Sequence, residues 1–116
     1  MEENTSTNGK TTIAPDVLLN IATLTALSTD GVSRMSSPPG GVSRLWKRGH
    51  QNEGVRIEIV DSNVNIDLFV ILKPEMNVRQ ISRNLQKAVS RAISEMVGMT
   101  PGKINVHVED IDFEEV

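Results

Sequence analysis

Four basic residues occupy every fourth position in a segment that also carries a regular apolar pattern. They are Arg79, Arg83, Lys87 and Arg91, and no acidic residue separates them. The apolar residues between 78 and 96 recur at spacings of three and four, so a helix places them opposite the basic row. Such a row is typical of a solvated helix face, or of a surface that binds an acidic protein, membrane headgroups or nucleic acid.

A second cluster pairs basic residues with the single tryptophan of the chain. Arg44, Trp46, Lys47 and Arg48 fall in a segment, residues 36–54, that is rich in proline and glycine and is predicted to be a long loop. An indole beside cations suits a headgroup boundary or a protein pocket. Three cations near an anionic surface contribute roughly 1 kcal/mol each, which predicts weak, reversible contact. The alternative is that Trp46 covers one end of the core.

His107 alternates with apolar neighbours in the last predicted strand. This places it on the outer face of the sheet, near Asn65, Asp67 and Phe69 of an earlier strand. A histidine beside a carboxylate can serve catalysis or bind a metal ion. The sequence offers no second histidine at ligand spacing and no positioned nucleophile, so we interpret His107 as a hydrogen-bonded histidine of the sheet face.

Phe69 and Ile71 are predicted to point to the same outer face as His107. An exposed apolar spot on a wetted sheet would contact a second copy of the chain or a partner. Equally, the N-terminal tail or the long loop would cover it.

Patterns that indicate an enzyme are absent from the sequence. There is no cysteine, and Gly40-Gly41 is followed by neither the lysine nor the third glycine that a phosphate-binding loop needs. The carboxylates at Asp61, Asp67, Asp110 and Asp112 are too scattered over turn, strand and tail for paired-carboxylate or calcium-loop chemistry. We therefore expect no catalytic residue, no cofactor and no metal ion.

Length and composition favour one intracellular domain. The chain has 116 residues, a formal net charge of -3 and 3% aromatic residues with no tyrosine. We expect a disordered tail at 1–10, one domain at 11–112 with the flexible loop at 36–54, and an acidic tail at 113–116. No secretory signal or membrane-spanning run is apparent. The negative charge and the lack of stacking aromatics make nucleic acid the less favoured partner, although the basic row keeps it as the alternative.

The periodicities predict a small α+β protein. Two amphipathic helices are expected on one face of a mixed or antiparallel sheet of about four strands, in a two-layer sandwich. In the first helix, the stripe is expected to be Val17, Leu18, Ile21, Leu24 and Leu27, with Ala14 a poor N-cap. The predicted segments are a helix at 14–27, short strands at 11–13 and 32–35, a hairpin at 55–59 and 64–72 with its turn at 61–63, a helix at 78–96 and a strand at 104–108.

Several segments together resemble one bacterial family. They are Ile13-Ala14-Pro15-Asp16-Val17, Ile21-Ala22, Gly31-Val32, Gly54-Val55, Val64-Asn65-Ile66-Asp67-Leu68, Asn77-Val78, Asn84-Leu85-Gln86, Val89, Met96-Val97-Gly98-Met99 and Ile104-Asn105-Val106-His107-Val108.

The family is the alkaline-shock, or Gls-type envelope stress response, proteins of Gram-positive and related bacteria. The resemblance covers roughly residues 9–111, and it departs at Ala14, where the family tends to carry serine. It implies a non-enzymatic cytoplasmic protein of envelope and alkaline stress that acts as an interaction or scaffold module. It also implies a protein partner. In one version of this expectation the partner is an integral membrane protein, which holds the chain at the inner face of the membrane. A homo-oligomer is an alternative assembly.

Overall fold

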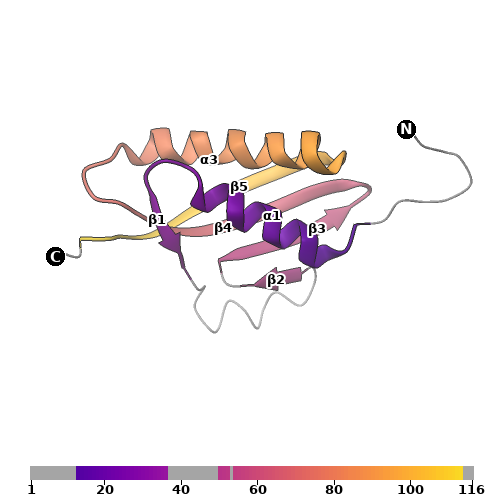
Figure 1. The fold of residues 1–116 in the computed structure, drawn as a ribbon, viewed down its shortest axis with the longest axis horizontal. Helices are drawn as coiled ribbons and strands as arrows, with labels where there is room; N and C mark the ends of the chain where they lie inside the picture. The colour runs from indigo at the N-terminus through magenta and orange to yellow at the C-terminus, as the bar shows by residue number, and fades with distance from the viewer. Residues whose placement is uncertain (1–12, 37–49, 53, 114–116) are drawn as a thin grey trace, which may run out of the picture.

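The chain folds into two layers, a five-stranded sheet and two helices that cover one face of it (Figure 1). The computed structural model describes residues 13–36, 50–52 and 54–113. In chain order the elements are α1 (Pro15–Leu27), β1 (Val32–Met35), β2 (His50–Asn52), β3 (Val55–Val60), β4 (Asn63–Leu72), α3 (Val78–Ala92), the π-helical turn η2 (Ile93–Val97) and β5 (Thr100–Ile111). The predicted α+β sandwich is confirmed.

β4 is the central strand, and two strands share one of its edges. β3 pairs antiparallel with the first part of β4, and β1 pairs antiparallel with the last part. The two meet at Phe69, whose backbone N–H donates to the carbonyl of Gly54 at 2.8 Å while its own carbonyl accepts from the N–H of Ser36 at 2.8 Å. β2 extends the sheet beyond β3. β5 runs parallel to β4 along its other edge, so the sheet is mixed.

The hairpin between β3 and β4 follows directly from its sequence. Asp61 and Ser62 have φ angles of 51° and 71°, as the two central residues of a turn that matches the strand twist require. Except for Ile59, which is 39% exposed near the turn, the alternating apolar residues of both strands then point to the helices, and each is at most 1% exposed. They are Val55, Ile57, Val64, Ile66, Leu68, Val70 and Leu72.

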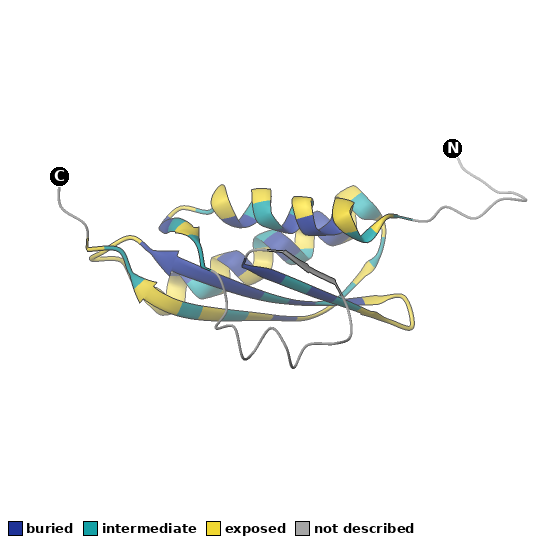
Figure 2. Ribbon diagram, turned by 90° about the horizontal axis from the view of Figure 1, so that it is seen from below, coloured by how far each residue is buried: buried dark blue, intermediate teal, exposed yellow. Residues whose placement is uncertain are grey.

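α3 is the clearest amphipathic helix of the fold. The Asn77 side chain accepts a hydrogen bond from the backbone N–H of Gln80 at 3.0 Å, which caps the first turn. Ile81, Leu85, Val89 and Ala92 face the sheet, while the opposite side of the helix is exposed (Figure 2). Gly98 ends the helical segment in the left-handed region, with φ 78°.

α3 also packs against β5. The side-chain amide of Gln86 donates to the backbone carbonyl of Ile104 at 3.1 Å. This hydrogen bond ties the middle of α3 to β5 at Ile104, the one buried residue of that strand.

The buried face of α1 differs from the predicted one. Leu18, Leu19, Ala22 and Ala26 are the buried residues of this helix. Val17, Leu24 and Leu27, which the spacing placed in the core, are exposed. The sequence of α1 is apolar on nearly all sides, so periodicity alone could not choose between faces, and packing against β1, β3 and α3 decides. Ala14 makes no side-chain cap, as expected.

Three other expectations need comment. β2 lies inside the segment predicted as a loop. The sequence did not predict this strand, because its three residues are polar and show no apolar alternation. Of the strand expected at 11–13, only Ile13 is described, and it belongs to no strand. Of the tails predicted at 1–10 and 113–116, only Phe113 lies within the described residues, and it is exposed.

Candidate interaction surface

The solvent side of α3 carries the four predicted basic residues, Arg79, Arg83, Lys87 and Arg91, which we call the basic ridge. All four are exposed, and they lie on the side of the helix opposite the buried row of Ile81, Leu85 and Val89. Residues four apart on a helix are neighbours, so the cations form a continuous row.

Little negative charge within the protein balances this row. Arg91 Nε forms an ion pair with Glu95 at 3.1 Å, one turn further on. No other carboxylate of the described residues lies within ion-pair distance of the basic ridge. Arg79 also sits in the first turn of α3, where the helix dipole disfavours a cation and no acidic residue is present. The ridge is therefore electrostatically unfavourable for the isolated fold.

Next to this ridge, α1 exposes apolar side chains to solvent. Val17 is 46% exposed, Leu24 65% and Leu27 44%, and Ile21 is half-buried between them. We call these four residues the α1 stripe. The spacing of these four residues predicted that they lie in the core.

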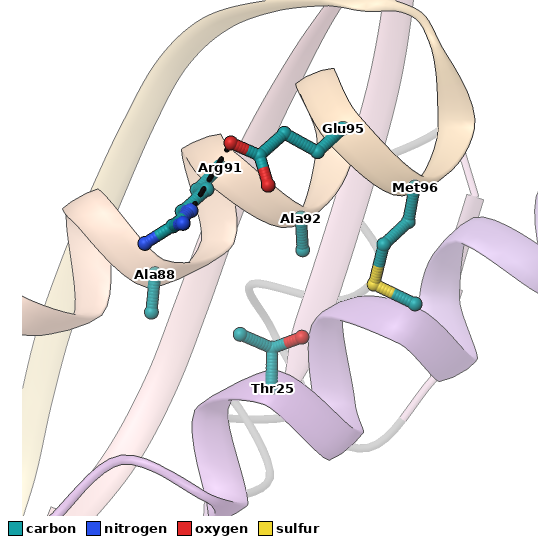
Figure 3. Close-up of a pocket in the computed structure, with 6 residues that line it drawn as sticks. All are labelled: Thr25, Ala88, Arg91, Ala92, Glu95 and Met96. Atoms are coloured by element: carbon teal, nitrogen blue, oxygen red, sulfur yellow. Dashed lines mark hydrogen bonds and ion pairs between the residues drawn. The ribbon is translucent and has the colours of Figure 1, made fainter.

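A groove of about 440 Å³ separates α1 from the end of α3 (Figure 3). Thr25 lines it from α1, and Ala88 and Ala92 line it from α3. Met96, in the π-helical turn η2, extends toward α1 and is 69% exposed, while the Arg91–Glu95 ion pair lies at the rim. The spacing of residues within one helix cannot reveal such a groove, because it forms only when α1 and α3 are packed together.

On the opposite face of the sheet, Asp67 organises a polar cluster. Its carboxylate accepts from Arg56 Nη1 at 3.3 Å and from Asn105 Nδ2 at 3.1 Å, and it lies 3.2 Å from His107 Nε2. The His107 ring also stacks on Phe69, with ring centroids 4.5 Å apart. The predicted neighbourhood of His107 is thus found, and its contacts are those of a hydrogen-bonded sheet histidine.

Of the two predictions for Phe69 and Ile71, the exposed apolar spot is wrong; the alternative, a cover by the N-terminal tail or the long loop, falls on segments outside the described residues. Phe69 is 5% exposed and Ile71 7%. The ring of His107 covers Phe69, and Ile71 lies between Arg34 of β1 and Asp110 of β5 in the sheet. The alternation of β4 alone had placed both residues on a solvated face.

The loop cluster of Arg44, Trp46, Lys47 and Arg48 lies outside the described residues. The structure therefore brings together the basic ridge, the α1 stripe and the groove. All three belong to the helical layer.

One family of proteins matches nearly the whole chain. The model of the alkaline shock protein 23 (ASP23) family, which has a cell envelope-related function, matches residues 3–113. The chain belongs to this family. The resemblance inferred from the sequence is confirmed.

Curated relatives of this alkaline-shock family chain come from Gram-positive bacteria. YqhY of Bacillus subtilis (strain 168) is 28% identical over 108 residues, which cover 91% of this chain and 79% of YqhY. Spy1614 of Streptococcus pyogenes serotype M6 is 22% identical over 107 residues, covering 90% of this chain and 88% of that protein.

Solved structures share the fold at low identity. The MamM CTD variant H285A matches with a TM-score of 0.54 and 18% identity, covering 82% of this chain and 95% of that one. The copper form of MamM CTD matches with a TM-score of 0.53 and 16% identity, covering 87% and 90%. At this identity the likeness supports the fold alone.

Two further observations concern the described part of this family member. Neither α1 nor α3 has the length and apolar character that a membrane crossing requires. Across residues 13–36, 50–52 and 54–113, no group of three or more histidine, cysteine or acidic side chains is arranged to hold a metal ion.

Proposed function

We propose that this alkaline-shock family chain is a non-enzymatic, cytoplasmic interaction module that docks on an envelope-associated protein partner through the basic ridge. The observation that carries the proposal is the exposed row of Arg79, Arg83 and Lys87, which has no carboxylate partner among the described residues. An integral membrane protein with an acidic cytoplasmic segment would place the module at the inner face of the membrane.

The energetics of the ridge support a binding role. Like charges four residues apart destabilise a helix, and a cation in the first turn opposes the helix dipole. Both costs disappear when an anionic surface lies against the ridge. Partner binding would thus recover free energy that the isolated fold loses.

The test compares two matched double variants of the full chain. Arg83→Gln with Lys87→Gln removes the centre of the ridge, and Lys73→Gln with Lys103→Gln removes two exposed cations elsewhere. Each tagged protein is recovered from membrane and soluble fractions of its host, and the co-purifying proteins are quantified.

We expect an envelope protein to co-purify with the wild type and the control but not with the ridge variant. Equal recovery by all three proteins would overturn the proposal.

A labelled oligonucleotide titrated at low ionic strength tests the alternative partner. Tight binding with a steep salt dependence would replace the protein partner with nucleic acid.

A further inference from the structure

The α1 stripe shows that the helical layer is incomplete on its solvent side. A helix that is apolar on nearly all sides is normally covered on all sides. Here the sheet and α3 cover one side of α1, while Leu24 remains 65% exposed and Val17 46% exposed. Substitutions to polar residues would leave the packing of the core unchanged, so the stripe indicates a second apolar surface that covers it.

The stripe and the basic ridge lie in the same layer. α1 and α3 pack side by side on one face of the sheet (Figure 1), and helices in such contact have axes about 8–10 Å apart. The groove between them has a floor of small residues, Ala88 and Ala92, and its wall includes the flexible side chain of Met96. A partner that fills the groove would meet apolar groups and, at the rim, Arg91 with its ion-pair partner Glu95; the rest of the basic ridge continues from Arg91 along α3.

We infer that the occupant of this surface is an acidic amphipathic helix of the partner, with its apolar row on the α1 stripe and groove and its carboxylates on the basic ridge. This inference rests on the proposed function and specifies the partner's chemistry. Charge complementarity demands acidic groups, and the exposed leucine, valine and methionine side chains demand an apolar row beside them. An amphipathic helix offers both at the spacing of one turn.

Other occupants fit less well. An extended segment would bind by adding to a strand edge of the sheet, whereas the α1 stripe and the basic ridge belong to the helical layer. A lipid surface is flat, whereas this surface is hollowed by the groove between α1 and the end of α3. Anionic lipid is therefore an alternative outcome of the test.

The experiment titrates the ¹⁵N-labelled full chain with a synthetic helical peptide of about 18 residues, or about five turns. The peptide carries leucine along one face and glutamate on the other. A peptide of the same composition with scrambled order, a peptide with lysine in place of glutamate, and vesicles of phosphatidylcholine with phosphatidylglycerol are the comparison probes. Backbone amide shifts locate the contact.

Two polar substitutions separate the apolar contact from the charge. Leu24→Ser removes the most exposed residue of the stripe, and Val60→Ser alters a 44% exposed valine at the distant hairpin. Because both side chains are exposed, both variants are expected to fold. Leu24→Ser should weaken binding of the acidic amphipathic peptide about tenfold, and Val60→Ser should leave it unchanged.

The inference is supported if shifts from the amphipathic acidic peptide concentrate in 17–27 and 80–96 and Leu24→Ser reduces the affinity. It is overturned if the scrambled peptide binds equally well, if Leu24→Ser has no effect, or if only the vesicles bind. If Arg83→Gln with Lys87→Gln releases the envelope partner while Leu24→Ser retains it, the inference fails and the proposed function stands. If the ridge variant retains the partner, the proposed function itself fails.

Discussion

Reversing the charge at the centre of the basic ridge should make the protein more stable. Lys87 has Arg83 and Arg91 as its neighbours four residues away, so Lys87→Glu turns two repulsive pairs into two attractive ones. Lysine and glutamate have similar helix propensities, and position 87 is exposed, so packing and propensity change little. The electrostatic difference should therefore dominate the effect.

Its size follows from the two pairs. A pair at this spacing contributes about 0.2–0.5 kcal/mol in either direction, and the introduced glutamate would precede Arg91 by four residues, which is the more favourable orientation. Since Arg91 already pairs with Glu95, the total should be about 1 kcal/mol at low salt. For a chain of 116 residues, this corresponds to a rise in the melting temperature of about 4 °C.

The change in melting temperature is measured by circular dichroism during thermal unfolding, at about 10 mM salt and again at about 1 M salt. At about 1 M salt the Debye length is about 3 Å, so screening should reduce the stabilisation. Lys103→Glu changes the net charge by the same amount on an exposed position of β5 and should bring no stabilisation. A Lys87→Glu variant no more stable than the wild type at low salt would refute the reasoning. The ridge would then impose no cost that partner binding could relieve.

Three other substitutions test the local structure by chemical or thermal denaturation. Ala14→Ser should stabilise by about 1 kcal/mol, because Ala14 provides no side-chain cap for α1, and faster amide exchange in the first turn of this variant would contradict that. Asp67→Ala should destabilise by about 2 kcal/mol through loss of the hydrogen bonds from Arg56 and Asn105, and an unchanged melting temperature would show that the cluster contributes nothing. Gly31→Ala should cost at least about 1 kcal/mol, because φ is +99° and the new Cβ would lie 2.5 Å from Ile81 Cδ1; wild-type stability would disprove this strain.

Local patterns were sufficient where one element decides its own structure. The Asn77 cap, the hairpin turn at Asp61 and Ser62, and the buried row of α3 follow from spacing and turn chemistry. Two features depend on tertiary packing instead. The buried face of α1 is chosen by its neighbours, and β2 is recognisable only through its pairing with β3.

In the candidate site, too, features within one helix could be predicted and features that need two elements could not. The basic ridge was predictable because its four residues lie on one helix at a fixed spacing. The groove needs α1 and α3 together, so no single segment of the sequence encodes it. Phe69 stacks on His107, which is distant in sequence but lies beside it in the sheet, and alternation within β4 alone could not show that Phe69 is buried.

The meeting of β1 and β3 at Phe69 has a consequence for how this chain can diversify. Through Phe69, the hydrogen bonding along this edge of β4 continues from Gly54 beside β3 to Ser36 beside β1. Pairing with β4 therefore aligns β1 and β3, and the covalent connection between β1 and β2 does not. Loop-closure entropy rises only slowly with loop length. Lengthening or shortening that connection should preserve the strand register, which makes it the natural place for an inserted reporter or for divergence between paralogues.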